Sequence, residues 1–161
     1  MDDLQVRAAT DDDQAAIAAI LTTTWGETHV VVHGTVFSAD TLPALVAEAN
    51  GGDIVGLLTY DLSADGLEVV TLDTTRQRRG VGSALLAAAQ STAQNAGLRR
   101  LWLVTTNDNL DALRFYQRRG LRILSVVPGA VDAARALKPA IPPVGEYGIE
   151  LHDELTLELR W

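Results

Sequence analysis

Residues 72–82 read Leu72-Asp73-Thr74-Thr75-Arg76-Gln77-Arg78-Arg79-Gly80-Val81-Gly82. Two glycines separated by one residue leave no side chain where a backbone could approach a ligand closely. At a helix start, the first N–H groups and the positive end of the helix dipole favour an anion. Three arginines stand beside the glycines. The stretch therefore predicts a loop that binds a phosphate or pyrophosphate.

The segments on both sides of this loop predict a strand before it and a helix after it. Upstream, two glycine-containing turns separate three β-rich runs at 45–47, 54–60 and 67–72, which indicates an antiparallel meander. Downstream, residues 80–96 are rich in alanine and leucine and end at Gly97, which is typical of a helix with a glycine stop.

The rest of the chain predicts further helices and strands. We expect a strand at 4–8, a helix from the Thr10 cap to about 25, a loop with a short helix at 27–43, and a buried strand at 101–104. A helix capped by Asn107 or Asp108 follows, then a strand at 121–127, a short helix at 131–138, a proline-rich loop at 139–148 and a half-buried strand at 151–160. The whole predicts an α/β protein with one domain over residues 1–161.

Two common phosphate-binding motifs do not fit the glycine pair. No Gly-Lys-Ser/Thr follows it, so it is not a Walker loop. A dinucleotide fingerprint needs a third glycine where Leu85 stands, and it follows a parallel strand rather than a meander. Without further evidence, the pair is also compatible with a tight strand-to-helix turn.

The sequence resembles the GNAT superfamily of N-acetyltransferases. Their acyl-CoA loop, Gln/Arg-x-x-Gly-x-Gly/Ala, stands here as Gln77-Arg78-Arg79-Gly80-Val81-Gly82, with apolar Leu72 five positions upstream. A second signature, Asn-x-x-Ala-x-x-x-Tyr-x-x-x-Gly-Phe, begins at Asn109, contains Tyr116, and departs only at its last residue, Leu121. The resemblance covers residues 4–127. It implies a mixed central sheet with an N-terminal antiparallel meander, flanked by helices, and acetyl-CoA as co-substrate.

The resemblance also implies roles on the acetyl-CoA side. Leu72 would contact the pantetheine arm through its backbone, and its N–H would stabilise the oxyanion of the tetrahedral intermediate. Asn109 would contact the same arm or cap its helix. The pyrophosphate would lie on the loop and the first helical turn, which comprise Gln77, Arg78, Arg79, Gly80, Val81, Gly82 and Ser83.

Tyr116 is the expected general acid. A phenol with a pKa near ~10 keeps its proton at rest and can give it to the departing CoA thiolate. Phe115 is expected to fill the core while Tyr116 points elsewhere.

A carboxylate is expected to act as the general base, because the amine must lose a proton. Glu68, in the third strand of the meander, is the first candidate, since apolar neighbours would raise its pKa. Asp73 and a chain of water molecules are the alternatives. Glu68 is expected either to face the cleft or to lie on a solvent edge.

The acceptor side is less defined in the sequence. Trp25, His29 and His33 lie in the segment that closes over the acceptor in this family, and packing or surface roles are favoured for each. The loop at 139–148, with nearby Glu146 and Glu150, could form another wall suited to a cationic amine. The three histidines show no ligand spacing, so no metal is expected.

Charge and composition restrict the partners. The net charge is −8, which disfavours nucleic-acid binding, although nine of the thirteen basic residues lie between positions 76 and 122. There is no cysteine, no apolar run long enough for a membrane helix and no signal-like N-terminus, so a cytoplasmic protein is expected. The expected partners are a small-molecule or peptide amine and, by resemblance, a second copy in a homodimer.

The leading hypothesis is an N-acetyltransferase acting on a primary amine in a ternary complex. A non-catalytic acyl-CoA-binding module that keeps the loop, and a nucleotide-phosphate binder, are the alternatives.

Overall fold

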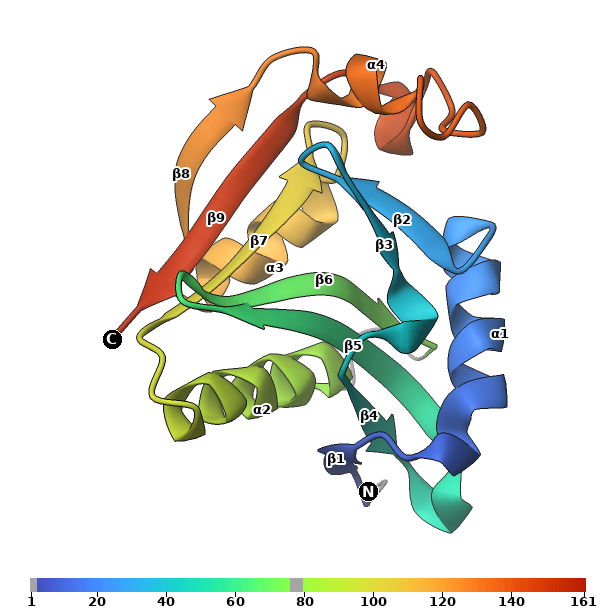
Figure 1. Ribbon diagram of the computed structural model, residues 1–161, viewed down its shortest axis with the longest axis vertical. Coiled ribbons are helices and arrows are strands. Elements are labelled where there is room, and N and C mark those ends of the chain that lie inside the picture. Colours follow the sequence, from blue (N-terminus) through green and yellow to red (C-terminus); the bar gives the residue numbers. More distant parts are fainter. Residues whose placement is uncertain (1–2, 76–79) are drawn as a thin grey trace. The chain divides into compact units, whose positions relative to one another are not determined.

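The computed structural model describes residues 3–75 and 80–161 (Figure 1). The chain forms two compact units, one comprising Met1–Val30 with Ser38–Leu101 and the other Val31–Phe37 with Trp102–Trp161. The prediction of a single domain over residues 1–161 stays a prediction.

The first unit contains four strands and two helices. In chain order these are β1 (Gln5–Ala8), α1 (Gln14–Trp25), β4 (Ala44–Glu48), β5 (Ile54–Ser63), β6 (Gly66–Thr74) and α2 (Val81–Asn95). The strands lie in the order β1-β4-β5-β6, and each neighbouring pair is antiparallel. The predicted meander and the helix after the loop are therefore confirmed. Short 3₁₀ turns at Asp11–Asp13, Ala39–Thr41 and Asn50–Gly52 connect these elements.

The 3₁₀ turn Asp11–Asp13, which leads directly into α1, is fixed by an ion-paired cap. The backbone N–H of Thr10 donates to Asp13 Oδ2 over 2.7 Å, and the N–H of Asp13 donates back to the Thr10 carbonyl over 2.9 Å. Arg7 of β1 contacts the same carboxylate at 2.7 Å and also pairs with Glu48 of β4. The Arg7 guanidinium holds the pKa of Asp13 well below its usual range. This network joins the first strand to the first helix.

One face of β4–β6 packs against α2. The buried side chains of the helix are Val81, Leu85, Leu86, Ala89 and Ala93. They recur at helical spacing, so the alanine-rich segment forms one apolar stripe towards the sheet. An extra residue in β6 changes the alternation of that strand, because Thr59 pairs with Thr71 but the next residue, Tyr60, pairs with Val69.

The second unit contains three longer strands and two helices. They are β7 (Arg100–Thr106, whose first two residues belong to the first unit), α3 (Leu110–Arg118), β8 (Arg122–Val127), α4 (Ala130–Ala134) and β9 (Glu154–Arg160). The strand order is β7-β9-β8, and β8 pairs antiparallel with β9. α4 is shorter than the predicted helix at 131–138.

Residues 27–43 differ from the prediction of a loop with a short helix. Here β2 (His29–Val32) and β3 (Thr35–Ser38) pair as a two-stranded hairpin. The physical reason is the run Val30-Val31-Val32, because β-branched side chains favour extended backbone. Gly34 then turns the chain with φ +76°, and His33 precedes it with φ +42°.

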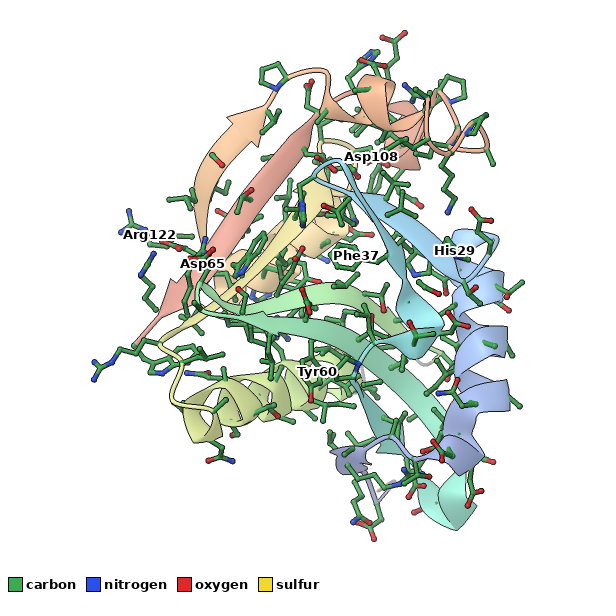
Figure 2. The ribbon with its side chains drawn as sticks, viewed as in Figure 1. His29, Phe37, Tyr60, Asp65, Asp108 and Arg122 are labelled. Carbon is green, nitrogen blue, oxygen red and sulfur yellow. The ribbon has the colours of Figure 1, made fainter. Side chains whose placement is uncertain are left out.

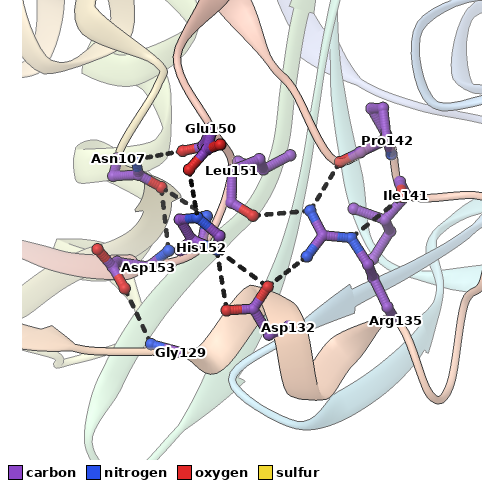
Figure 3. A network of polar contacts seen from close by, with 10 residues as sticks. All are labelled: Asn107, Gly129, Asp132, Arg135, Ile141, Pro142, Glu150, Leu151, His152 and Asp153. Atoms are coloured by element: carbon purple, nitrogen blue, oxygen red, sulfur yellow. Dashed lines mark hydrogen bonds and ion pairs between the residues drawn. The ribbon is translucent and has the colours of Figure 1, made fainter.

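The proline-rich segment before β9 is held by a polar network (Figure 3). The Arg135 guanidinium donates to the carbonyls of Ile141, Pro142 and Leu151. The Asn107 side chain donates to the Glu150 carbonyl over 2.8 Å and accepts from the N–H groups of His152 and Asp153. The segment is thus an ordered loop tied at both of its ends.

His152 belongs to the same network. Its ring lies 3.0 Å from the Asp132 carboxylate and 3.2 Å from Glu150 Oε2, and both acids raise the pKa of the imidazole, Asp132 the more strongly. No helix among residues 3–75 and 80–161 is long and apolar enough to cross a membrane.

Candidate active site

The N-terminus of α2 has the geometry expected of an anion site. Gly80 is its N-cap, with a left-handed φ of +75° that glycine adopts without strain. The first hydrogen bond of the helix runs from Ala84 N–H to the Gly80 carbonyl over 3.0 Å. The amides of Val81, Gly82 and Ser83 precede that bond at the positive end of the helix. Gln77, Arg78 and Arg79 lie outside the described residues.

Gly56 of β5 sets how closely this helix end approaches the sheet. A Cβ atom at Gly56 would lie 2.5 Å from Val81 Cγ1 and 2.9 Å from Leu85 Cδ1, which is closer than side chains can pack. The glycine therefore lets the first turn of α2 rest directly on β5. Gly56 is not identifiable from the sequence, because the role of a glycine within a strand becomes clear only when the element packed on that face is known.

Three polar side chains share the other face of β6. Asp73 pairs with Leu57, Thr71 with Thr59, and Glu68 with Asp61. Opposite residues in an antiparallel pair point to the same face, and residues 57, 59 and 61 of β5 alternate regularly. The extra residue in β6 thus brings Glu68 onto the same face as Asp73, although five positions separate them.

The two carboxylates that β6 contributes to this face are buried. Glu68 is 4% exposed and Asp73 is 7% exposed. Of the two positions expected for Glu68, the solvent edge is therefore wrong. The hydroxyl oxygens of Thr59 and Thr71 lie 2.6 Å apart and form a hydrogen bond. This pair lies between Glu68 and Asp73 on the same face.

Asp73 lies in a polar contact with the end of α1. Trp25 Nε1 donates to Asp73 Oδ2 over 3.0 Å, and the Thr24 side chain also hydrogen-bonds the carboxylate. Burial raises the pKa of Asp73 to about 6, since desolvation outweighs these two donors. Trp25 thus has a defined contact beyond packing. Leu72, the preceding residue, is half-buried and pairs with Leu58.

Tyr116 is the buried aromatic of α3. It is 9% exposed, whereas Phe115 is half-buried. The two rings meet edge to face at 5.2 Å, and the Arg119 guanidinium lies 3.7 Å above the Phe115 ring. The expectation that Phe115 fills the core while Tyr116 points elsewhere is therefore wrong. Arg119, one turn along the helix, covers the outer aromatic instead.

Asn109 is the N-cap of α3. Its side-chain oxygen accepts from Ala112 N–H over 3.4 Å, and its amide donates to Thr105 Oγ1 over 3.1 Å. The capping role expected for Asn109 as one of two alternatives is therefore confirmed, whereas the cap expected at Asn107 or Asp108 is wrong. Those two residues instead bind the proline-rich segment.

Asp108 ties that segment to the start of α3. It is 6% exposed and accepts from the Thr106 hydroxyl and, over 2.8 Å, from Glu146 N–H. A Cβ at Gly145 would lie 2.0 Å from Asp108 Oδ2, so only glycine fits beside it. Tyr147, with φ +57°, donates its hydroxyl to Asp111 Oδ1 over 2.7 Å. No group of three or more His, Asp or Glu residues that could hold a metal ion occurs in the described part of the chain.

Comparison with known proteins identifies the family. The model of the Acetyltransferase (GNAT) family matches residues 9–121. The uncharacterized protein YdhI of Bacillus subtilis (strain 168) is 39% identical over 131 residues, which are 81% of this chain and 82% of YdhI. The chain therefore belongs to the GNAT acetyltransferase family.

Solved structures share its fold. A GNAT family acetyltransferase from Elizabethkingia anophelis with acetyl-CoA bound aligns with a TM-score of 0.70 at 19% identity and covers 100% of both chains. Arabidopsis thaliana Naa50, in complex with the bisubstrate analogue CoA-Ac-MVNAL, aligns with a TM-score of 0.70 at 16% identity over 98% of this chain and 99% of that one. The predicted α/β fold, with its GNAT-like mixed sheet and antiparallel meander, is confirmed. The protein is therefore an acetyltransferase of the GNAT type.

Proposed function

We propose that this enzyme transfers the acetyl group of acetyl-CoA directly to a primary amine of a small molecule or peptide while both substrates are bound. The observation that carries the proposal is Asp73, a buried carboxylate with its pKa raised to about 6, directly after Leu72 in β6. Such a group can accept a proton from an amine near neutral pH. The bisubstrate analogue bound to Naa50 supports simultaneous binding.

On the acetyl-CoA side, the first turn of α2 supplies the binding groups. The amides of Gly80, Val81, Gly82 and Ser83 would donate to the pyrophosphate, with Gln77, Arg78 and Arg79 before them in the chain. Leu72 would hydrogen-bond the pantetheine arm through its backbone, and its N–H would stabilise the negative oxygen of the tetrahedral intermediate. Asn109 would contact the same arm in addition to its capping role.

The chemistry needs two proton transfers. The amine nitrogen forms a bond to the acetyl carbon, and the carbon–sulfur bond breaks. The base takes the proton that the amine loses and later releases it to water. Tyr116 gives its hydroxyl proton to the CoA sulfur and regains one from water. A phenol suits this role, because its hydroxyl can donate a proton to the departing sulfur.

Two carboxylates compete for the role of base. Glu68 and Asp73 share one face of β6 and are both buried. We assign the base to Asp73, because its pKa of about 6 leaves it deprotonated at neutral pH and still basic enough to accept a proton. Glu68→Gln and Asp73→Asn separate the two, since only the base variant should lose turnover by about 10²-fold or more. If a chain of water molecules acts as the base, neither variant should lose turnover to this extent.

The direct test of the proposed function follows CoA release with a panel of primary amines. We expect release to depend on both acetyl-CoA and one class of amine. Gly82→Trp should abolish the rise in melting temperature that acetyl-CoA produces, because a bulky side chain obstructs the helix start. Acetyl-CoA that stabilises the enzyme without any amine-dependent release would favour the non-catalytic module instead.

A second copy of this chain is the proposed protein partner, and β8 is the surface that supports it. All six residues of β8 are exposed, and four of them, Ile123, Leu124, Val126 and Val127, are large and apolar. β8 ends the strand order β7-β9-β8, so one of its edges is open in the described structure. An identical strand can pair with it antiparallel about a two-fold axis. Arg122 is its only charged residue, and in that arrangement the two copies of Arg122 stand at opposite ends.

A further inference from the structure

The last turn of α1 reaches the carboxylate that we propose as the base. Ile17 and Leu21 are the buried side chains of this helix, and the positions that follow them at helical spacing are Thr24 and Trp25. α1 contacts both β5 and β6 of the same unit. The face of the helix that packs on the sheet therefore ends in a hydroxyl and an indole.

The Trp25 indole extends from the surface to a buried charge. Its residue is 38% exposed, whereas Asp73 is 7% exposed, and Trp25 Nε1 donates to Asp73 Oδ2 over 3.0 Å. Trp25 is the last residue of α1. Gly26 ends the helix with a left-handed φ of +82°, and its N–H donates to the Thr22 carbonyl over 2.9 Å. The backbone beside the indole is thus held by the helix cap.

The hydrogen bonds of Asp73 act against its desolvation. Burial raises the pKa of the carboxyl to about 6, whereas the donors from Trp25 and then Thr24 lower the pKa. Both donors therefore favour the ionised carboxylate, which is the form that can accept a proton. In the described part of the chain, no charged side chain contributes to this pKa.

Few titratable groups belong to the elements around Asp73. Glu68 of β6 and Asp61 of β5 share its face of the sheet, and α1 contains no charged residue. His29 begins β2, four positions after Trp25 (Figure 2). Neutral donors rather than a cation thus stabilise the ionised form of Asp73.

We propose that Trp25 is a positioning residue for the acetyl transfer, because its indole N–H holds the Asp73 carboxylate in place and in the ionised form that accepts the proton of the amine. An indole suits this role, since it donates a hydrogen bond and carries no charge. An arginine at this place would lower the pKa of the carboxyl much further and leave it a weak base. This role of Trp25 rests on the proposed assignment of Asp73 as the base.

The pH dependence of turnover tests this role. Trp25→Phe keeps a ring but removes the donor, so the pKa of Asp73 should rise further and less of the base is ionised at low pH. We expect kcat/KM of the variant, relative to wild type, to be about one tenth at pH 5.5 and about one at pH 9, since a lost hydrogen bond to a charge changes proton affinity about tenfold. With one amine for both enzymes, the titration of the amine cancels in this ratio. A ratio that is equally low at every pH would indicate a structural role alone and overturn the proposal.

NMR of the carboxyl carbons during a pH titration measures the contact without turnover. Asp73→Asn identifies the Asp73 resonance, because it removes it. We expect the midpoint of Asp73 to move up by about one pH unit in Trp25→Phe. The carboxyl of Asp65, in the turn at the other end of β6 (Figure 2), should keep its midpoint.

The two measurements separate this proposal from the proposed function. An unchanged midpoint for Asp73 in Trp25→Phe would overturn the role of Trp25 and leave Asp73 as the base. A midpoint that moves while the activity ratio stays at about one would overturn Asp73 as the base, and with it the role of Trp25. If no amine gives CoA release, the proposed function fails, and the midpoint still decides whether Trp25 holds the carboxylate.

Further variants locate the effect. Thr24→Val removes the second donor and should move the midpoint in the same direction as Trp25→Phe does. Thr23→Val, at a hydroxyl that donates to the Ala19 carbonyl over 2.8 Å, is its matched control, and Trp161→Phe controls for loss of an indole. Imidazoles also change charge between pH 5 and 8, so His29→Gln should leave the activity midpoint unchanged. An activity midpoint that disappears in His29→Gln would overturn the proposal.

Discussion

Asp73, the proposed general base, is buried at a cost to the stability of the fold. Burial raises the pKa of its carboxyl from 3.8 to about 6, so the folded protein binds the proton more tightly than the unfolded chain does. The stabilisation that follows from this tighter proton binding is complete below about pH 4. It is lost as the pH rises through 6, because the folded state must then hold a buried charge.

Asp73→Asn should therefore stabilise the protein at neutral pH. The amide resembles the protonated carboxyl and carries no charge, so we expect the free energy of unfolding at pH 8 to rise by about 1–3 kcal/mol. At pH 4 the difference should vanish. Urea unfolding at both pH values measures it, with Asp53→Asn at an exposed aspartate as the control. A variant that is less stable than wild type at pH 8 would contradict this account of the pKa.

Tyr116→Phe tests the proposed general acid. Loss of the hydroxyl leaves the CoA thiolate to depart without a proton, so kcat should fall by about 10²-fold or more. Acetyl-CoA affinity should change less than about twofold, since the ring stays in place. Phe115→Leu is the control, because it alters the packing against Tyr116 and Arg119 but removes no proton. An unchanged kcat in Tyr116→Phe would exclude Tyr116 as the acid.

Residues that belong to a sequence motif were predicted in the correct strand or helix. Residues whose position depends only on packing were missed. The motifs that contain Leu72, Gly80 and Tyr116 are sufficient to predict the strand or helix to which each residue belongs. The burial of Tyr116 in place of Phe115 depends on which side of α3 faces the protein, and adjacent positions on a helix differ by about 100°. Asp108 and Gly145 lie 37 positions apart in the sequence, so their contact has no local signal.

At the scale of elements, the approach of α2 to β5 sets the position of the proposed pyrophosphate site. Gly56→Ala places a Cβ against Val81 and Leu85, and overpacking of this kind costs about 1–3 kcal/mol. The first turn of α2 must then shift, so acetyl-CoA should raise the melting temperature less than in wild type. Ala87→Val adds bulk on the exposed side of the same helix and serves as the control. Wild-type affinity for acetyl-CoA in Gly56→Ala would show that the contact does not position the helix.

The hairpin of β2 and β3 explains why 27–43 was predicted incorrectly. Its strands have four residues each, too short for an alternating pattern to be distinguished from a loop. What holds it is distant in sequence, since His33 N–H bonds to Glu154 from 121 positions away. The meander was predictable for the opposite reason, because its turns and strands are consecutive.

The whole molecule carries a net charge of −8, and this charge acts on its association. Two identical acidic chains repel each other, whereas the apolar strand β8 favours their contact. Salt screens the repulsion and leaves the apolar contact almost unchanged. A dimer through β8 should therefore strengthen as ionic strength increases.

Leu124→Lys tests this surface as a unit. Leu124 is 55% exposed near the middle of β8, so in an antiparallel pair its lysine would face the partner strand close to the equivalent lysine. We expect sedimentation to give twice the chain mass for wild type and a single chain mass for this variant. Leu62→Lys, at an apolar residue 43% exposed in β5, should remain a dimer. At high salt the repulsion between the two acidic chains is screened, so the apolar contact through β8 alone decides whether they associate. A wild-type enzyme that sediments with the mass of one chain under these conditions would exclude the dimer.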